Sequence, residues 1–198
     1  MKRFKLPKKA AHMGAWFMPK ELMDKIDLWW NENKDYVAAG LSGPEYEKDS
    51  MDLGIEPYDF NEPWGSYRDE LQLCLNDFLN QFPESDELQQ SFNIHENYNL
   101  QWYPKGGGFK SWHHENAGDV RGIHRHLVFM TYIDDVPEAG TAFKYQDIVT
   151  PCVKGLTLIW PAGWTHTHKS QVTMKHEKRI ITGWYNYDKI FDIFKDER

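Results

Sequence analysis

Hydrophobic residues in the first 91 positions recur at helical spacing in two stretches. After Pro19, apolar residues form one face before the polar run 31–34, which predicts a helix with the face Leu22, Met23, Ile26, Trp29 and Trp30. A second helix is predicted to begin near Ser66 and Asp69 and to end before Pro83, with the face Leu71, Leu75, Phe78, Leu79 and Phe82. We therefore expect a helical N-terminal half, residues 1–91, that supports the rest of the chain.

The segment between these two helices, residues 41–63, is rich in Gly, Pro and acidic residues and reads as a loop. Within it, the alternation of Lys48, Ser50 and Asp52 predicts a short strand. We assign this segment no chemistry.

From Phe92 the pattern changes to short runs rich in β-branched and aromatic residues, separated by Gly, Pro and Asp. The runs are Asn99–Tyr103, Phe109–His114, His126–Ile133, Thr141–Tyr145, Gly155–Trp160 and Arg179–Tyr185. Such a series predicts an antiparallel sandwich or barrel, such as a jelly roll (double-stranded β-helix). We expect a mainly β protein with flanking α-helices, formed by one domain over residues 1–198. Its jelly-roll core spans 92–187, and 188–198 forms a C-terminal helix or tail, helical over Asp188–Phe194.

Composition and charge narrow the class of function. The net charge of -7 and the pI near 5.7 disfavour nucleic acid as a partner, since its binders carry basic surfaces. The two cysteines, Cys74 and Cys152, have the spacing of neither a disulfide framework nor a zinc site. We expect a soluble, cytoplasmic protein without a membrane span, because no apolar run approaches the ~20 residues of a bilayer-crossing helix. The basic arm, residues 1–9, is expected to be a solvated tail.

Candidate chemistry is concentrated around one His-x-Glu triplet. His113 and Glu115 share a face if they lie on a strand, and His166 and His168 form a distal pair after the predicted strand ending at Trp160. Nine histidines and 30 acidic residues in 198 positions give about one such triplet by chance, so the triplet alone is weak. Two histidines and a carboxylate on one face of an octahedral ion suit non-haem Fe(II) and leave the other face open. His114 is expected to point away from the metal.

Together with their neighbours, these residues resemble the prolyl 4-hydroxylase-like branch of the Fe(II)- and 2-oxoglutarate (2OG)-dependent oxygenases. The resemblance spans roughly residues 99–185, and small phage-encoded members look especially similar. It is carried by Tyr103-Pro104-Lys105-Gly106-Gly107-Gly108-Phe109, His113-His114-Glu115, Arg125, Thr131-Tyr132-Ile133-Asp134, Gly140-Thr141-Ala142-Phe143, Pro151, Gly155, Leu158, His168 and Lys178.

The resemblance implies a role for each matching residue. His113, Glu115 and His168 are expected to hold Fe(II), with Glu115 standing where the family more often has Asp. Lys178, ten residues after His168, is expected to bind the far carboxylate of 2OG. Tyr132, Tyr103 and Thr182 are expected to complete the 2OG site. Such an enzyme uses O2, releases succinate and carbon dioxide and hydroxylates an unreactive C–H bond.

Several alternatives remain open from the sequence. His166 competes with His168 as the distal ligand, although only His168 has the ten-residue offset to Lys178. Arg125, His124 and Trp184 are candidates for the substrate side of the site. The substrate is unidentified and is either peptidyl proline or a small molecule, and the sequence leaves the oligomeric state open. The competing functions are a cupin-like metal enzyme that does not use 2OG and a catalytically silent jelly-roll binding or virion-associated module.

Overall fold

Two antiparallel β-sheets, a separate pair of short strands and two long helices form the core of the computed structural model, which describes residues 2–40, 47–120 and 122–188. In the described residues the main sheet has nine strands. Their order is β1 (Lys2–Arg3), β2 (Gly14–Phe17), β12 (Leu156–Pro161), β9 (Arg125–Tyr132), β14 (Lys178–Tyr187), β7 (Tyr98–Tyr103), β5 (Met51–Ile55) and β3 (Ala38–Ala39), with β6 (Phe92–Asn93) paired to β14.

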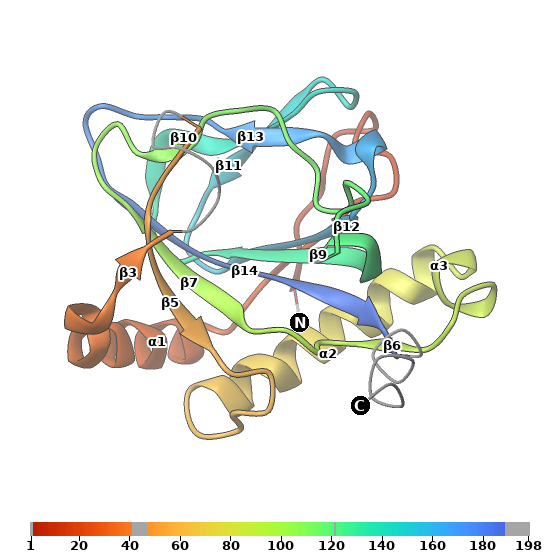
Figure 1. Ribbon diagram of the computed structural model, residues 1–198, viewed down its shortest axis with the longest axis horizontal. Coiled ribbons are helices and arrows are strands. Elements are labelled where there is room, and N and C mark those ends of the chain that lie inside the picture. The colour runs from red at the N-terminus through yellow and green to blue at the C-terminus, as the bar shows by residue number, and fades with distance from the viewer. Residues whose placement is uncertain (1, 41–46, 121, 189–198) are drawn as a thin grey trace.

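A smaller sheet faces the main one across the molecule (Figure 1). It has the order β11 (Ile148–Cys152), β10 (Val136–Phe143) and β13 (His168–Ser170), and a further pair joins β4 (Lys48–Asp49) to β8 (Gly108–Phe109). The helices are α1 (Lys20–Asn33), α2 (Trp64–Gln81) and the single turn α3 (Glu84–Glu87), with 3-10 turns η1 (Lys34–Tyr36), η2 (Gly122–His124) and η3 (Trp164–His166). This is the predicted jelly-roll arrangement with flanking helices.

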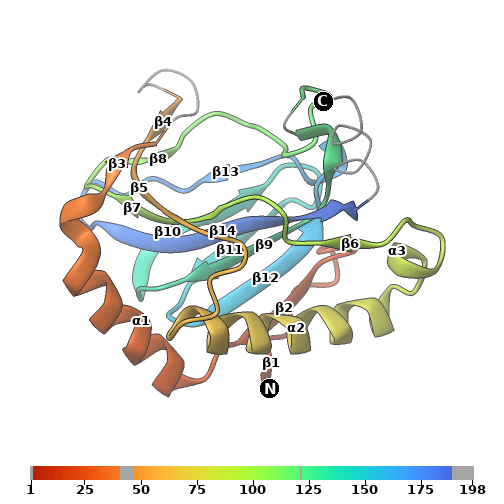
Figure 2. The same ribbon diagram turned by 60° about the horizontal axis from the view of Figure 1, so that its bottom comes forward.

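Helices α1 and α2 cover the face of the main sheet that is turned away from the smaller sheet (Figure 2). The alternation along β9 explains this layering, because successive side chains of a strand point to opposite faces. Leu127 and Phe129 pack into the cluster with the two helices, whereas Val128, Met130 and Tyr132 pack toward the smaller sheet. The molecule therefore has two apolar layers, and the second contains the space between the sheets.

Both helices predicted from the periodicity form, but the predicted helical N-terminal half is wrong. Strands β1, β2, β3, β4 and β5 all come from the first 55 residues, and four of them extend the main sheet at its two edges. Pairing with the central sheet gives these short segments backbone hydrogen-bond partners that local propensity cannot reveal. In addition, α2 begins at Trp64, two residues before the predicted Ser66.

The basic N-terminal arm keeps its charged side chains exposed, as expected, but it is paired with the main sheet and is not a free tail. Lys2 and Arg3 pair with β2, and the Arg3 guanidinium binds the Asp77 carboxylate of α2, with Nε to Oδ2 at 2.6 Å. Phe4 and Leu6 pack against the inner core. The helix predicted at Asp188–Phe194 lies outside the described residues, apart from Asp188.

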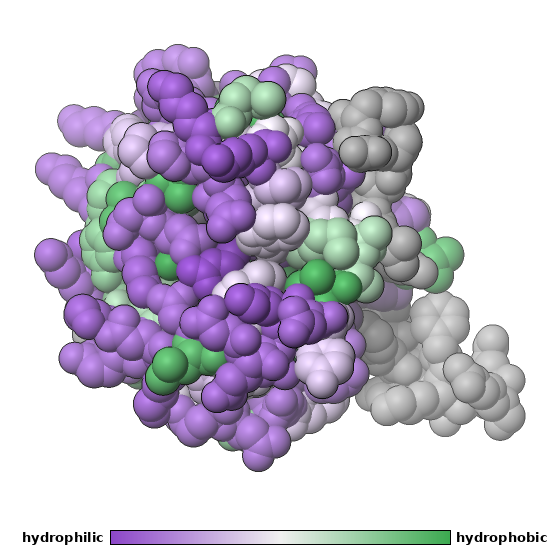
Figure 3. All heavy atoms as spheres, turned by 90° about the vertical axis from the view of Figure 1, so that its left-hand side faces the viewer, coloured by the Kyte–Doolittle hydropathy of each residue, from purple (hydrophilic) through white to green (hydrophobic). Residues whose placement is uncertain are grey.

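Hydrophilic residues predominate on the side of the molecule where α1 and β3 lie (Figure 3). Within the described residues, no helix has the length and apolar character needed to cross a membrane. Cys74 and Cys152 are both buried free thiols, as their spacing predicts.

A glycine on β10 makes the closest backbone approach to β11. A Cβ at position 140 would lie 1.6 Å from the carbonyl oxygen of Thr150, which belongs to the paired strand. We expect Gly140→Ala to lower the free energy of unfolding by about 3 kcal/mol, because a backbone atom cannot move aside as a side chain can. Gly163→Ala is the control, since a Cβ there meets nothing within 4 Å and the residue has φ -75°. Equal urea midpoints for the two variants would contradict this expectation.

Candidate functional site

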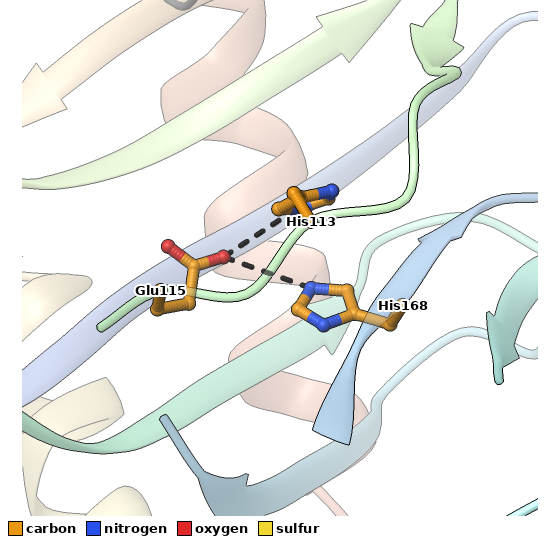
Figure 4. Close-up of side chains that lie close together, drawn as sticks. All are labelled: His113, Glu115 and His168. Carbon is orange, nitrogen blue, oxygen red and sulfur yellow. Dashed lines mark ion pairs between the residues drawn. The ribbon is translucent and has the colours of Figure 1, made fainter. Parts of the chain in front are cut away.

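Three side chains with metal-binding atoms converge between the two sheets (Figure 4). The Nε2 atoms of His113 and His168 lie 3.5 Å and 3.6 Å from Oε1 of Glu115. One ligand atom from each residue lies within 4.8 Å of the other two. This spacing fits the donor set of a single metal ion with two imidazoles and one carboxylate.

Backbone pairing brings these residues together from distant parts of the chain. His113 and His168 form an isolated antiparallel bridge. The amide of His113 donates to the carbonyl of His168 at 3.0 Å, and the amide of His168 donates to the carbonyl of His113 at 2.9 Å. The amide of Glu115 donates to the carbonyl of Ala162 at 3.0 Å. The predicted strand Phe109–His114 is therefore wrong, since β8 ends at Phe109. His113 and Glu115 converge through the bridge to His168 and the contact with Ala162.

Each histidine of the cluster has its outer ring nitrogen bound to a backbone carbonyl. Nδ1 of His113 donates to Ser111 at 3.0 Å, and Nδ1 of His168 donates to His166 at 2.9 Å. Because a carbonyl only accepts, each Nδ1 carries the proton and each Nε2 presents its lone pair toward Glu115. The same outer hydrogen bond fixes the tautomer and orientation of histidines that bind metals in other proteins. Both imidazoles are thus prepared to act as ligands.

The other candidate for the distal position, His166, points away from this cluster. Its Nε2 donates to the carbonyl of Ala11 at 3.0 Å, and its side chain is buried against that N-terminal segment. His114 is also outside the cluster. The structure therefore brings His168, and not His166, to the His113 and Glu115 pair.

Burial and neighbouring charges shift the pKa values of the cluster strongly. Burial raises the pKa of Glu115, but its close contacts with His113, His168 and Arg125 bring the pKa down to about 2. Burial and the neighbouring His113 lower the pKa of His168 to about 3. An ionised carboxylate beside a neutral imidazole is the protonation state in which these groups bind a metal.

The cluster lies at the wall of a pocket of about 520 Å³. One wall comes from the neighbouring strands β9, β14 and β7 of the main sheet, whose pocket-facing residues include Met130, Ile180, Thr182, Trp184, Asn99, Gln101 and Tyr103. A volume of this size is in the ordinary range for small-molecule and cofactor sites.

A buried lysine lies just behind this wall. Lys178 is on the same face of β14 as Ile180, and its Nζ lies 5.5 Å from the ring centre of Tyr103. It is 3 % exposed, and it donates to the carbonyl oxygens of Ala139 at 2.6 Å and Gln171 at 3.5 Å. No described carboxylate lies within 4.0 Å of it. Burial lowers the pKa of Lys178 to about 8.

The other residues predicted to contact 2OG lie at different depths. Tyr103 and Thr182 line the pocket, and the hydroxyl of Tyr103 donates to Oε1 of Gln101 at 2.6 Å. Tyr132 lies behind the pocket wall, where its hydroxyl bonds to Thr141 and Thr150 at 2.8 Å each.

The predicted substrate-side residues separate into two groups. Arg125 and Trp184 line the pocket and contact Glu115 directly, at 3.1 Å and 2.9 Å. His124, in η2, is outside the pocket lining.

Sequence reasoning missed several pocket residues. Glu96 binds Arg125, and Lys48, Asp52 and Gln101 form a hydrogen-bonded group at the far wall. The alternation of Lys48, Ser50 and Asp52 predicted their strand, but no local signal linked it to the site. Only the pairing of β5 with β7 places Asp52 opposite Gln101.

Comparison with known proteins identifies the class of fold. No family model matches the sequence, and no curated protein matches it. Solved structures do match, and several of them are prolyl hydroxylases. A prolyl-4-hydroxylase of Pseudomonas putida has a TM-score of 0.66 at 14% identity, covering 90% of this chain and 94% of that chain. A viral collagen prolyl hydroxylase of Paramecium bursaria Chlorella virus-1, in a 2OG complex, has a TM-score of 0.66 at 15% identity. The match covers 90% of this chain and 98% of the viral chain.

A third solved structure extends the same result. The prolyl hydroxylase of Trichoplax adhaerens, in complex with a hypoxia inducible factor oxygen degradation domain peptide fragment, has a TM-score of 0.70. It is 12% identical and covers 93% of this chain and 87% of that chain. The chain therefore has the fold of the prolyl 4-hydroxylase-like 2OG oxygenases, as the sequence resemblance predicts.

Proposed function

We propose that this protein is a non-haem Fe(II)- and 2OG-dependent dioxygenase that hydroxylates a C–H bond of its substrate. The observation that carries the proposal is the cluster of His113, Glu115 and His168, in which both histidines have their outer nitrogens bound to carbonyls. Three protein ligands on one side of the ion are a donor set typical of this chemistry. Iron, when bound, supplies the activation of oxygen.

The fit of 2OG rests on Lys178. A buried ammonium without an acidic partner is costly, and an entering carboxylate would compensate it. We propose that Lys178, with Tyr132, Tyr103 and Thr182, binds the far carboxylate of 2OG, while the keto-acid end faces the three ligands. The pocket walls would exclude water from this end of the site.

The substrate is proposed at a coarser level. A peptidyl proline and a polar small molecule both remain open, and the peptide bound to the Trichoplax adhaerens enzyme supports the first only by fold. The polar far wall, with Lys48, Asp52 and Gln101, favours a substrate that carries hydrogen-bonding groups. We also propose that residues 1–198 act as one oxygenase domain, since strands from both halves line the pocket.

Anaerobic titration of the Fe(II)-loaded protein with 2OG tests the proposal. We expect a visible metal-to-ligand charge-transfer band that grows to saturation at one equivalent, because chelation by the keto acid needs two free positions on the iron. Succinate, which has no keto group, is the matched control and produces no band. A protein that binds Fe(II) without developing this band would refute 2OG as its co-substrate.

A further inference from the structure

The second carboxylate oxygen of Glu115 has partners of its own. While Oε1 faces the two histidines, Oε2 accepts from Nη1 of Arg125 at 3.1 Å and from the indole Nε1 of Trp184 at 2.9 Å. Both donors come from the central strands of the main sheet, β9 and β14. The two oxygens of one carboxylate are therefore held in different environments.

Arg125 is itself held rigidly from three directions. Its Nε and Nη2 donate to the two oxygens of Glu96, at 2.8 Å each, and its guanidinium lies 3.5 Å from the ring centre of Trp184. Asn186 in turn donates to Glu96 at 2.9 Å. The Arg125 side chain is only 14% exposed, so these contacts replace most of its water. A forked guanidinium bound at both ends to carboxylates has little freedom to turn toward another group.

We propose that Arg125, Trp184 and Glu96 form a clamp that positions Glu115 so that only Oε1 is presented to the metal. The inference rests on the proposed function, because it concerns the same iron site. Arg125 and Trp184 are thereby positioning residues.

The physical need for such a clamp follows from the length of the glutamate side chain. Glu115 has three rotatable side-chain bonds, and a free carboxylate at the end of such a chain can bind a metal through one or both oxygens. Binding through both would occupy a further position on the ion, which 2OG and oxygen need. Two donors on Oε2 fix the orientation of the carboxylate and hold the ligand in its one-oxygen mode.

Metal binding without turnover provides the test. Trp184→Phe keeps an aromatic ring but loses the indole N–H, and Arg125→Lys keeps the charge but loses the forked guanidinium. We expect each variant to weaken Co(II) or Fe(II) binding about 10-fold in chelator competition. This is the lower end of the effect of outer-sphere partners of metal ligands. The Co(II) d–d absorption bands are expected to shift as Glu115 begins to bind through both oxygens.

Two matched variants control for the loss of a similar contact elsewhere. Trp102→Phe removes an indole N–H that donates to Glu177 at 3.2 Å, and Arg179→Lys removes a guanidinium fork bound to Asp134. Both are expected to keep the wild-type metal affinity and Co(II) spectrum. Melting temperatures show whether each variant is folded. Glu96→Gln loosens Arg125 without touching Glu115, and it is expected to shift the Co(II) spectrum in the same direction as Trp184→Phe and Arg125→Lys.

Two outcomes separate the clamp from the proposed function. Folded Trp184→Phe and Arg125→Lys proteins with unchanged metal affinity and spectra would overturn the clamp and leave these residues to the substrate side. A wild-type protein that binds metal but gives no charge-transfer band with 2OG would overturn the proposed function, while the metal affinities of the variants still decide the clamp.

Discussion

His113→Ala is expected to abolish the oxidative decarboxylation of 2OG, with the rate of succinate formation falling at least about 1000-fold, or about 4 kcal/mol of transition-state stabilisation. The physical reason is the loss of one of three protein ligands, which leaves Glu115 and His168 to hold the ion. The 2OG charge-transfer band should disappear with the activity. Succinate formation under saturating iron and 2OG is the measurement.

His114→Ala is the matched control for this change. It removes a neighbouring imidazole that is outside the three-residue cluster, and it is expected to retain the rate of succinate formation. Persistent turnover by iron-loaded His113→Ala protein would refute the assignment of this ligand.

Lys178→Met is expected to raise the dissociation constant of 2OG at least about 100-fold, because a carboxylate placed in this pocket would lose a buried cation that no described carboxylate already pairs. The variant should remain folded with an unfolding free energy close to wild type, since methionine has a similar length and removes the cost of a buried ammonium. Anaerobic titration of the charge-transfer band measures the affinity.

Lys48→Met is the comparison for this prediction. Lys48 is also buried and lines the pocket, but its charge is already paired with Asp52 at 2.8 Å. Its replacement is expected to leave the affinity for 2OG close to wild type. A large loss of 2OG affinity in Lys48→Met with none in Lys178→Met would show that the 2OG carboxylate binds Lys48 and not Lys178.

The lowered pKa of Lys178, about 8, adds a pH dependence to the same experiment. The 2OG dianion binds the protonated ammonium, so its affinity is full below the pKa and falls about 10-fold per unit above it. Titratable groups near Lys178 include Cys152 on β11 and Tyr103 on β7. Lys178→Arg, which stays charged, is expected to remove this dependence between about pH 6.5 and about pH 8.5.

These results also decide between the competing functions. A cupin-like metal enzyme would bind iron and tolerate Lys178→Met without loss of activity. A silent binding module would show neither the charge-transfer band nor succinate formation.

The sequence by itself predicted the jelly-roll class and both long helices. Strand period and turn residues are local signals, so β7, β9, β12 and β14 were placed within a few residues. The same local reasoning missed β1, β2 and β3 in the first 55 residues, because these short strands depend on pairing at the edges of the sheet. It also failed at Phe109–His114, where a β-rich run ends after Phe109.

At the site, the sequence supplied the residue types, and the tertiary structure decided their arrangement. The spacing of His113 and Glu115, and of His168 and Lys178, is visible in the chain. Whether His166 or His168 reaches Glu115 depends on the register of β13 with β10 and on the bridge to His113.

The partners of Arg125 and Lys178 were decided entirely by the fold. Arg125 binds Glu96, 29 positions away, and Trp184 reaches Glu115 across 69 positions, so no local pattern contains either contact. Lys178 differs from the exposed lysines among the described residues because β14 buries it without a described carboxylate beside it. Side-chain chemistry is encoded locally, whereas charge compensation and ligand orientation arise only when distant strands pack together.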